Sequence, residues 1–277
     1  MPLKIKTLIF LILISFFLPV SSSRAETLEE QPPEQAPPVV AAPPAWEPRL
    51  EEARALAKKE EDLKAREIYE SLLKEEGLGE QEAAVRKEYE ALNMKLIFSP
   101  VETPESTFHE VAPGDNLSGL AKKYGTTVTL LQKSNHLDSA DKIYVGKKLK
   151  VPKVPFSILI KKQANELVLS AGNRPIKTYP VATGEGGSTP VGTFSIANKL
   201  ENPTWYHAGA IVPPDSPKNI LGSRWLGFDK KGYGIHGTTL PETIGHQASK
   251  GCIRMLNADA EELYDLIPLG AQVEVVE

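Results

Sequence analysis

One cysteine and one histidine near the C-terminal end of the chain have the residue types needed for nucleophilic catalysis. Cys252 is the single cysteine among 277 residues and follows a glycine in the stretch SKGCIR, which starts at Ser249. His236 lies in the stretch YGIHGT, which starts at Tyr233. A thiolate can attack a carbonyl while an imidazole accepts and later returns the proton. These residues therefore suggest thiol catalysis, although a lone cysteine is also a common small apolar core residue.

A second histidine competes for the role of base. His246 lies between His236 and Cys252, but it sits in a polar loop and lacks the Gly-Thr pair that follows His236. We therefore expect His236 to be the base. The single cysteine excludes a Cys-x-x-Cys motif, and the chain has no His-Glu-x-x-His motif, so we expect neither a metal nor another cofactor.

The composition disfavours a partner that is recognised mainly through charge. Lys and Arg number 32 against 36 for Asp and Glu, which gives a formal net charge of -4. Nucleic acids and anionic lipids attract strongly basic proteins, so neither is an expected partner. The length corresponds to about two domains of roughly 150 residues each.

Hydrophobic periodicity predicts the elements that position the cysteine and the histidine. Four apolar residues alternate with polar neighbours, which is typical of half-buried strands: Ile158, Ile160, Leu167 and Leu169. Similar short stretches follow, and we expect them to pair as antiparallel strands. Asn257 is a candidate cap for a helix through Ile267, and a last strand is predicted from Gln272 to Val276. The pattern predicts an all-β, β-sandwich-like domain with small helices over residues 156–277.

This domain contains four separated motifs: ATGEGGSTPVGTF, LGSRWLGF, IHGT and SKGCIRM. In this order they resemble the motifs of the catalytic domain of L,D-transpeptidases. The resemblance implies that Cys252 is the nucleophile and His236 the general base. The backbone carbonyl of Gly237 would hold the imidazole in its useful tautomer. The amides of Gly251 and Cys252 would form the oxyanion hole.

The resemblance also implies residues that bind the substrate. Arg254 would neutralise a substrate carboxylate or support the loop, and Ser249 would complete the nucleophile loop. Tyr233 and Trp205 are further expected substrate contacts. Lys250 stands where many family members have histidine, which affects a substrate contact rather than the reaction.

Lowering the pKa of the thiol would by itself accelerate the reaction little. A free cysteine with a pKa of about 8.5 is roughly 3% thiolate at pH 7. A pairing that lowered the pKa to about 6.5 would raise this fraction about 25-fold, while the intrinsic nucleophilicity would fall about 8-fold. We therefore expect orientation and oxyanion donors to supply most of the rate.

The reaction that the resemblance implies is acyl transfer on peptidoglycan. The thiolate would attack the bond between the diamino acid and the terminal D-Ala of a tetrapeptide stem. Transfer to an amine of a second stem would give a 3→3 cross-link. Water as acceptor would make the chain an L,D-carboxypeptidase, and a protein amine would make it an enzyme that attaches proteins to the wall. Carbapenems acylate this family and are expected covalent inhibitors.

Two alternatives use different chemistry or none. A glycan-binding scaffold with an inactive catalytic domain is disfavoured because Cys252, His236 and Gly251 are all present. A sortase also uses cysteine and histidine, but its histidine lies far upstream, and its arginine lies farther downstream than Arg254, which here is two positions after Cys252.

Residues 107–152 carry the signals of a strand, two helices and a second strand. Asn116 and Thr127 are candidate N-caps for the two short helices. The elements PGDNLSGLAKKYG and GKKLKVP resemble the LysM family, a small α+β (βααβ) module. This resemblance implies binding to glycans that contain N-acetylglucosamine, here peptidoglycan. The expected glycan contacts are Gly114, Asp115, Asn116 and Asn135.

The N-terminal part of the chain predicts export. Within residues 1–25, lysines precede an apolar run that is too short to span a membrane, and small residues follow it, as in a signal peptide. We expect cleavage after Ala25, and the alternative is that the segment is kept as a membrane anchor. The protein is therefore expected in the periplasm or cell envelope. Residues 26–48 are rich in proline and predict a disordered linker.

Residues 49–99 predict amphipathic helices. Their apolar residues recur at helical spacing, and Gly77 to Gly79 should divide them into a hairpin of two helices. The first half resembles a tetratricopeptide unit, and one such unit cannot bury its own apolar face. We expect a spacer or a docking module for a protein partner, with the apolar stripes forming core.

Overall fold

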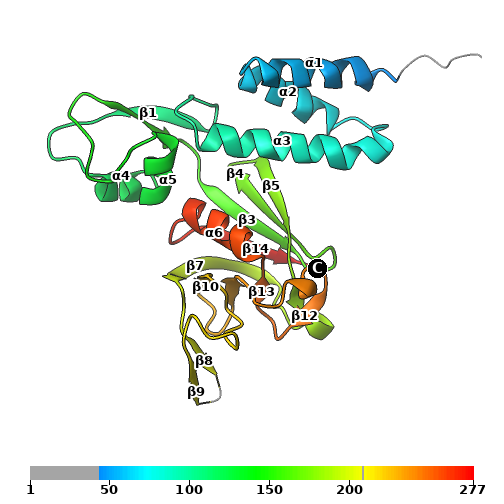
Figure 1. The fold of residues 1–277 in the computed structure, drawn as a ribbon, viewed down its shortest axis with the longest axis vertical. Helices are drawn as coiled ribbons and strands as arrows, with labels where there is room; N and C mark the ends of the chain where they lie inside the picture. Colours follow the sequence, from blue (N-terminus) through cyan, green and yellow to red (C-terminus); the bar gives the residue numbers. More distant parts are fainter. Residues whose placement is uncertain (1–43, 208) are drawn as a thin grey trace, which may run out of the picture. The chain divides into compact units, whose positions relative to one another are not determined.

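The computed structural model describes residues 44–207 and 209–277 (Figure 1). The predicted signal peptide and most of the predicted linker lie outside the described residues. The first helix begins at Trp46, so the last three residues of the predicted linker are helical instead. Proline is tolerated in a first helical turn, and Trp46 packs against the core of the helices. No helix within the described ranges is long and apolar enough to cross a membrane.

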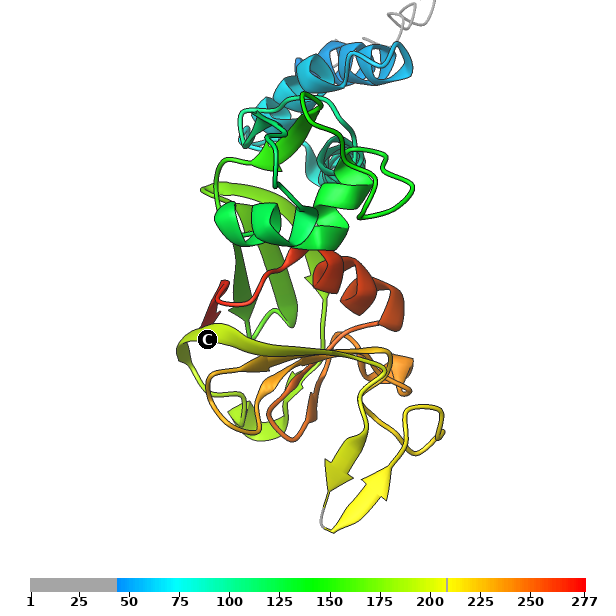
Figure 2. The same cartoon turned by 90° about the vertical axis from the view of Figure 1, so that its left-hand side faces the viewer.

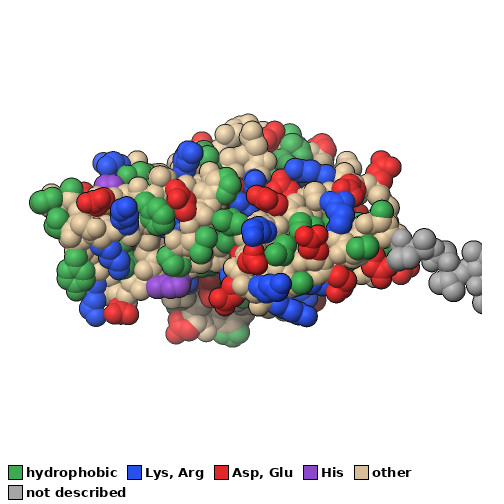
Figure 3. Space-filling view, turned by 90° about the horizontal axis from the view of Figure 1, so that it is seen from above, with side chains coloured by type: hydrophobic (Ala, Val, Ile, Leu, Met, Phe, Trp, Pro, Cys, Tyr) green, Lys and Arg blue, Asp and Glu red, His purple; other side chains and the backbone are tan. Residues whose placement is uncertain are grey.

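The segment before the first strand contains three α-helices instead of the predicted two. The helices are α1 (Trp46–Lys58), α2 (Asp62–Leu72), the 3-10 turn η1 (Gly79–Gln81) and α3 (Glu82–Ile97). The additional break falls at Glu60, whose φ of 62° lies in the left-handed region and cannot continue a right-handed helix. Basic and acidic side chains alternate over the surface seen in Figure 3, and pairs such as Arg54–Glu88 join neighbouring helices.

The predicted apolar stripes of these helices are core. Seven of their residues are buried together: Ala65, Tyr69, Leu72, Val85, Tyr89, Leu92 and Leu96. Helix α3 also contacts strand β5 (Arg174–Pro180). Asn93 Nδ2 donates to the Ile176 carbonyl at 3.0 Å, and the Tyr89 hydroxyl donates to the Pro175 carbonyl at 3.2 Å. The helical unit thus packs part of its surface against the strand-rich domain that contains β5.

Residues 106–152 fold as strand, helix, helix and strand, as predicted. The elements are β1 (Ser106–Glu110), α4 (Leu117–Lys123), α5 (Val128–Ser134) and β2 (Lys148–Pro152), and the two strands pair antiparallel. Both predicted caps are present. Asn116 Oδ1 accepts from the Gly119 amide at 2.8 Å, and Thr127 Oγ1 accepts from the Leu130 amide at 2.9 Å.

The remaining residues form a strand-rich domain with one α-helix among those that the structure describes. Its first elements are β3 (Phe156–Lys161), β4 (Glu166–Ala171), β5, β6 (Thr183–Gly184), η2 (Glu185–Gly187), β7 (Gly192–Glu201), β8 (Trp205–His207) and β9 (Ala210–Val212). The later ones are β10 (Arg224–Phe228), β11 (Gly234–His236), η3 (Pro241–Thr243), β12 (Gln247–Ser249), β13 (Ile253–Arg254), α6 (Asn257–Leu266) and β14 (Gln272–Val276).

An eight-stranded sheet organises this domain, in the order β13-β11-β10-β7-β14-β3-β4-β5. The long strand β7 joins its two halves: its first residues pair with β14 and its last residues with β10. The prediction of antiparallel pairing throughout is wrong at three places: β12 runs parallel to β6 in a separate two-stranded sheet, and the main sheet holds two parallel pairs. Strand β14 runs parallel to β3, and β13 runs parallel to β11, because the chain returns through α6 and through the cysteine loop instead of through tight hairpins.

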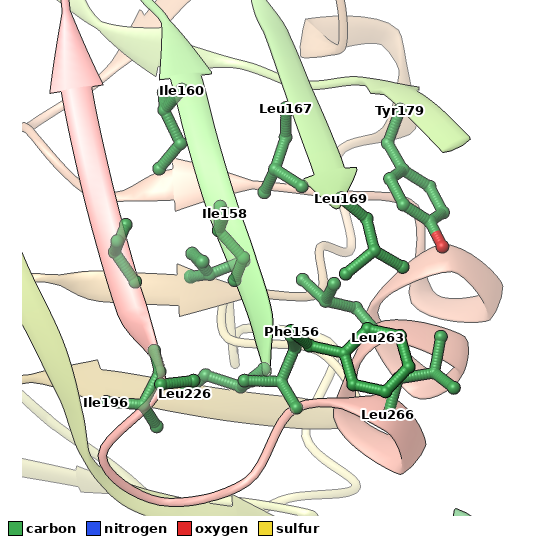
Figure 4. Packing of buried hydrophobic residues seen from close by; sticks show 14 of the residues in the cluster. Phe156, Ile158, Ile160, Leu167, Leu169, Tyr179, Ile196, Leu226, Leu263 and Leu266 are labelled. Carbon is green, nitrogen blue, oxygen red and sulfur yellow. The ribbon is translucent and has the colours of Figure 1, made fainter. Parts of the chain in front are cut away.

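Helix α6 covers one face of the sheet and closes the core (Figure 4). The predicted alternation in β3 and β4 places Ile158, Ile160, Leu167 and Leu169 on the buried face. Leu263 and Leu266 of α6 pack against this face, as Figure 4 shows. The hairpin of β8 and β9 extends away from the sheet (Figure 2).

Candidate active site

Cys252 lies in the short loop between β12 and β13, where hydrogen bonds within the loop fix the backbone. The Ser249 hydroxyl donates to the Cys252 carbonyl at 2.6 Å and accepts from the Gly251 amide at 3.0 Å. Ser249 is buried. Its hydroxyl therefore shapes the nucleophile loop, and contact with substrate stays a prediction for this residue.

The Gly251 amide, which was expected to be an oxyanion donor, has a partner in this structure. Its N–H donates to Ser249 Oγ at 3.0 Å. Buried amides are nearly always paired, and here the partner comes from the same loop. The oxyanion roles of the Gly251 and Cys252 amides stay predictions.

Glycine at position 251 is required by the backbone. Its φ is +123°, and a Cβ added there would lie 2.8 Å from Cε1 of Tyr233 and 3.1 Å from the Ser188 carbonyl oxygen. The ring of Tyr233 thus packs against the nucleophile loop. Tyr233, which was expected to contact the substrate, therefore contacts the loop that carries Cys252 and is not one of the residues that line the cleft described below.

Thr189 supports the same loop from the glycine-rich segment that precedes β7. Its hydroxyl donates to the Gly251 carbonyl at 3.0 Å and accepts from the Gly184 amide at 2.7 Å. The side chain is 1% exposed. The sequence placed Thr189 in a family-like motif, but no local signal indicated that it would bridge two segments more than 60 residues apart.

His236 ends strand β11 and is buried beneath the ring of Trp225. The two rings stack with centroids 5.9 Å apart. His236 Nδ1 lies 2.6 Å from the Gly237 carbonyl oxygen, as expected. Because a carbonyl only accepts, Nδ1 carries the proton and Nε2 of the neutral ring keeps its lone pair.

Burial sets the resting charge of this pair. Desolvation lowers the pKa of His236 to about 4, the Gly237 hydrogen bond opposes this shift, and the positive charge of Arg254 adds to it. Desolvation also raises the pKa of Cys252, against the influence of the Gly234 backbone and Arg254. The thiol and the imidazole are therefore both neutral at rest near pH 7. The pKa of the thiol is raised here, whereas the pairing considered from the sequence would have lowered it.

One cleft brings together the cysteine, the histidine and most of the predicted substrate residues. Its volume is about 430 Å³, within the range of pockets that hold small ligands. Five of the predicted site residues line it: Trp205, His236, Ser249, Cys252 and Arg254. Lys250, which stands where many family members have histidine, lines it as well. The Cys252 thiol donates to the Gly232 carbonyl at 3.4 Å.

Further residues of this cleft were missed by the sequence reasoning. Tyr206, Ile220, Leu221 and Trp225 form much of its apolar wall. They come from the β8–β9 hairpin, the loop before β10 and β10 itself, so their proximity depends on the tertiary fold. His246 is exposed and does not line this cleft, which favours His236 as the base.

Arg254 is buried in the domain beside His236. It pairs in register with His236 across the parallel strands β13 and β11. The side chain is 8% exposed, and its Nε has no hydrogen-bond partner among the described residues. A buried guanidinium that lines a cleft is suited to hold a carboxylate.

Three of the predicted glycan contacts precede the first helix of the smaller module, α4, and the fourth, Asn135, follows the second helix, α5. Asp115 Oδ2 accepts from the Ala112 amide and lies 2.8 Å from His109 Nε2. Asn116 caps α4, and Gly114 has a φ of +89° in the preceding turn. Asn135 is bonded to the backbone of Lys150 through both ends of its amide. These contacts build the turns, and contact with sugar stays a prediction.

Comparisons with known proteins identify both modules. The L,D-transpeptidase catalytic domain family, YkuD, matches residues 155–275, and the LysM domain family matches residues 109–152. The chain is 41% identical over 126 residues to the putative L,D-transpeptidase YqjB of Bacillus subtilis (strain 168), over 43% of this chain and 70% of that protein. It is 35% identical over 175 residues to the putative L,D-transpeptidase YkuD of the same strain, over 60% of this chain and 97% of that protein.

A solved structure of an L,D-transpeptidase from Mycobacterium smegmatis is similar at a TM-score of 0.38 and 20% identity, and the match covers 48% of this chain and 65% of that chain.

These matches define the class of the protein as a cell-wall enzyme with a separate LysM domain. The chain belongs to the YkuD-type L,D-transpeptidase family. The enzyme class and the two resemblances expected from the sequence are thereby confirmed, and the LysM and transpeptidase domains imply association with peptidoglycan.

Proposed function

We propose that this enzyme forms an acyl-enzyme at Cys252 on a peptidoglycan stem and transfers the acyl group to an amine of a second stem, giving a 3→3 cross-link. The observation that carries the proposal is the single cleft lined by Cys252 and His236. In this cleft the imidazole is neutral near pH 7 and is bound at Nδ1 by the Gly237 carbonyl. Its Nε2 is the base that the reaction needs.

In the first half-reaction, the thiol proton moves to Nε2 of His236 as Sγ attacks the carbonyl between the diamino acid and the terminal D-Ala. The Cys252 amide stabilises the negative oxygen of the tetrahedral intermediate. The carbon–nitrogen bond then breaks, and the imidazolium returns its proton to the amine of the departing D-Ala. A thioester and a neutral imidazole remain.

In the second half-reaction, an amine of another stem attacks the thioester carbonyl. Nε2 accepts a proton from this amine and returns it to the sulfur when the thioester breaks. The thiol and the neutral imidazole are restored, and a new amide joins the two stems. No cofactor takes part in either step.

Arg254 and the aromatic wall are proposed to position the donor stem. The guanidinium of Arg254 would hold a stem carboxylate near the reacting carbonyl. Its buried Nε has no hydrogen-bond partner among the described residues, so this N–H could donate to the carboxylate. Trp205 lies at the start of the β8–β9 hairpin and lines the same cleft. It would contact the apolar surface of the stem.

The LysM domain is proposed to raise the local concentration of stems. A glycan contact on the same chain converts the encounter of catalytic domain and stem into an intramolecular one. This effect increases occupancy of the cleft at low substrate concentration and leaves the chemical steps unchanged. The predicted contacts at Gly114, Asp115, Asn116 and Asn135 belong to this part of the proposal.

Intact-mass measurement with a carbapenem tests the nucleophile. We expect the unaltered protein to gain one adduct and the Cys252→Ala variant to gain none. The His246→Ala variant is the matched control and should acylate normally, because His246 is exposed and lies outside the cleft. An adduct on the Cys252→Ala variant would exclude Cys252 as the acylated residue.

Analysis of muropeptides after incubation with purified sacculi tests the acceptor. Dimers cross-linked 3→3 are the expected product. Tripeptide monomers without such dimers would instead identify water as the acceptor and the enzyme as an L,D-carboxypeptidase.

A further inference from the structure

The peptide unit between Gly237 and Thr238 is held at both of its polar ends. Its carbonyl oxygen accepts from His236 Nδ1 at 2.6 Å. Its N–H, which belongs to Thr238, donates to Asn257 Oδ1 at 3.0 Å. A peptide unit is planar and rigid, so the direction of the N–H fixes the direction of the carbonyl. Asn257 is therefore connected to the imidazole through one rigid group.

The fit around the Asn257 side chain is close. Its Oδ1 also accepts from the Ser223 amide at 3.2 Å. A Cβ added at Gly237 would lie 2.1 Å from this oxygen, and one added at Gly222 would lie 2.2 Å from it. Glycine at both positions provides the space that lets the oxygen reach two loops at once.

The backbone of Asn257 is fixed by helix α6, which is anchored in the core. Asn257 is its first residue, and Ala260, Leu263 and Leu266 of the same helix are buried in the main core. Asn257 was expected to cap the helix. The residue at the cap position is instead Leu256, without a side-chain hydrogen bond, and the Asn257 side chain bonds to the loops.

We propose that Asn257 is a positioning residue that orients the Gly237–Thr238 peptide, so that its carbonyl keeps the proton on Nδ1 of His236 and leaves Nε2 as the base. The inference rests on the proposed function for its effect on acyl transfer. The bond at the N–H end also polarises the carbonyl and strengthens the bond at the other end. The ring of Trp225 stacks on the imidazole, the Cys252 thiol lines the same cleft, and Arg254 acts on the imidazole through its charge, whereas Nδ1 bonds to the Gly237 carbonyl.

The test compares three variants of the full chain in a carbapenem acylation assay. Asn257→Ala removes the acceptor and should slow acylation roughly 10- to 100-fold at saturating drug, with little change in half-saturation. Asn257→Asp keeps an acceptor oxygen and should recover most of the rate. Its negative charge should also shift the acid limb of the pH profile to higher pH, because it favours the imidazolium. Asn173→Ala, at an exposed turn, is the control and should behave as the unaltered protein.

A second readout does not depend on activity. In protein with ¹⁵N-labelled histidine, the two ring nitrogen shifts report the tautomer of His236. We expect the Nδ1–H form in the unaltered protein and in Asn257→Asp, and a mixture of forms in Asn257→Ala. If Asn257→Ala does not fold, Asn257→Ser replaces it, since its shorter side chain lacks the reach to the Thr238 amide.

The outcomes separate the two proposals. A variant without the acceptor that keeps the Nδ1–H form, or that acylates at the normal rate, would overturn the role of Asn257. Failure of the unaltered protein to acylate would overturn the cysteine chemistry, while the tautomer measurement would still decide whether Asn257 orients the peptide.

Discussion

The resting charges of Cys252 and His236 determine how acylation should depend on pH. Burial holds the pKa of His236 at about 4 and raises that of Cys252. In the proposed reaction the imidazole is therefore available as base across the neutral range, and the thiol becomes ionised in the course of the attack. The alternative of a preformed thiolate–imidazolium pair requires the opposite shift of the thiol.

We expect the rate of acylation to rise with pH through about 4 and then to stay level through neutrality. The imidazole is protonated below this pH and cannot accept the thiol proton, whereas it is neutral above it. Single-turnover rates with a carbapenem, measured between pH 3.5 and 8, provide the check. A rate that instead climbs tenfold per pH unit through 7 would indicate that ionisation of the free thiol controls the reaction.

Thr189 should affect the reaction although it is not a cleft residue. The Thr189→Val variant keeps the shape but removes the bonds to Gly251 and Gly184, so two buried backbone groups lose a partner. We expect a destabilisation of about 1–3 kcal/mol and a rate of acylation lowered by roughly tenfold. Thermal unfolding and acylation rates test this, with Thr189→Ser as the matched variant that keeps the hydroxyl. Equal behaviour of the two variants would contradict a role for the bridge.

At the scale of elements, the sequence predicted those features that depend only on neighbouring residues, such as helix caps and the buried faces of strands. Asn116 and Thr127 were recognised as caps because a cap is formed within one turn of its helix. The parallel pairing of β14 with β3 was missed, because the partners lie more than 100 residues apart and no local pattern encodes their direction. Periodicity identified the buried faces of β3 and β4 correctly, since each face depends only on alternation.

The same distinction applies to the candidate site. The motifs indicated Cys252 and His236, which the structure brings to one cleft. The support from Thr189 and Asn257 was not predictable, because each bonds to a loop that is distant in sequence. The bond from the Gly251 amide to Ser249, two residues earlier, is local but was also not predicted, because it depends on the rotamer of the serine.

The contact of α3 with β5 should contribute measurably to stability. Asn93 is fully buried and donates to the Ile176 carbonyl, so Asn93→Ala removes the partner of that carbonyl and leaves a small cavity. We expect a loss of about 1–3 kcal/mol in the free energy of unfolding, measured with urea. Lys87→Ala on the exposed side of the same helix is the control. An unchanged midpoint for Asn93→Ala would show that the contact contributes nothing.

At the scale of the whole molecule, Lys150 ties the LysM domain to the helices that precede it. Its Nζ donates to the carbonyls of Leu96 and Ser99 at 2.6 and 2.9 Å, at the C-terminal end of α3. A cation at this end of a helix is favourable, but burial lowers the pKa of Lys150 to about 8. Below this pH the ammonium group of Lys150 is charged in the folded protein, and its desolvation destabilises the folded state.

This shift predicts a gain in stability between pH 8 and 10.5. In that window the unfolded chain binds a proton at Lys150 that the folded chain does not, so the free energy of unfolding rises with pH, by up to about 3 kcal/mol. Lysine of normal pKa would add no such slope. Denaturant titrations at several pH values give the free energy of unfolding. Its increase with pH across this window should be present in the unaltered protein and absent in Lys150→Met, since the variant lacks the titrating group. Identical slopes would show that Lys150 titrates normally.

The bond from the Cys252 thiol to the Gly232 carbonyl has a consequence for the lifetime of the enzyme. Peroxides react with the thiolate, and a sulfur that keeps its hydrogen until a substrate arrives is a poor target for them. A protein with one cysteine has no second thiol to reverse such damage as an internal disulfide. In the proposed reaction, where the thiol ionises only during the attack, Cys252 is a weaker nucleophile at rest and is more resistant to sulfenic acid formation.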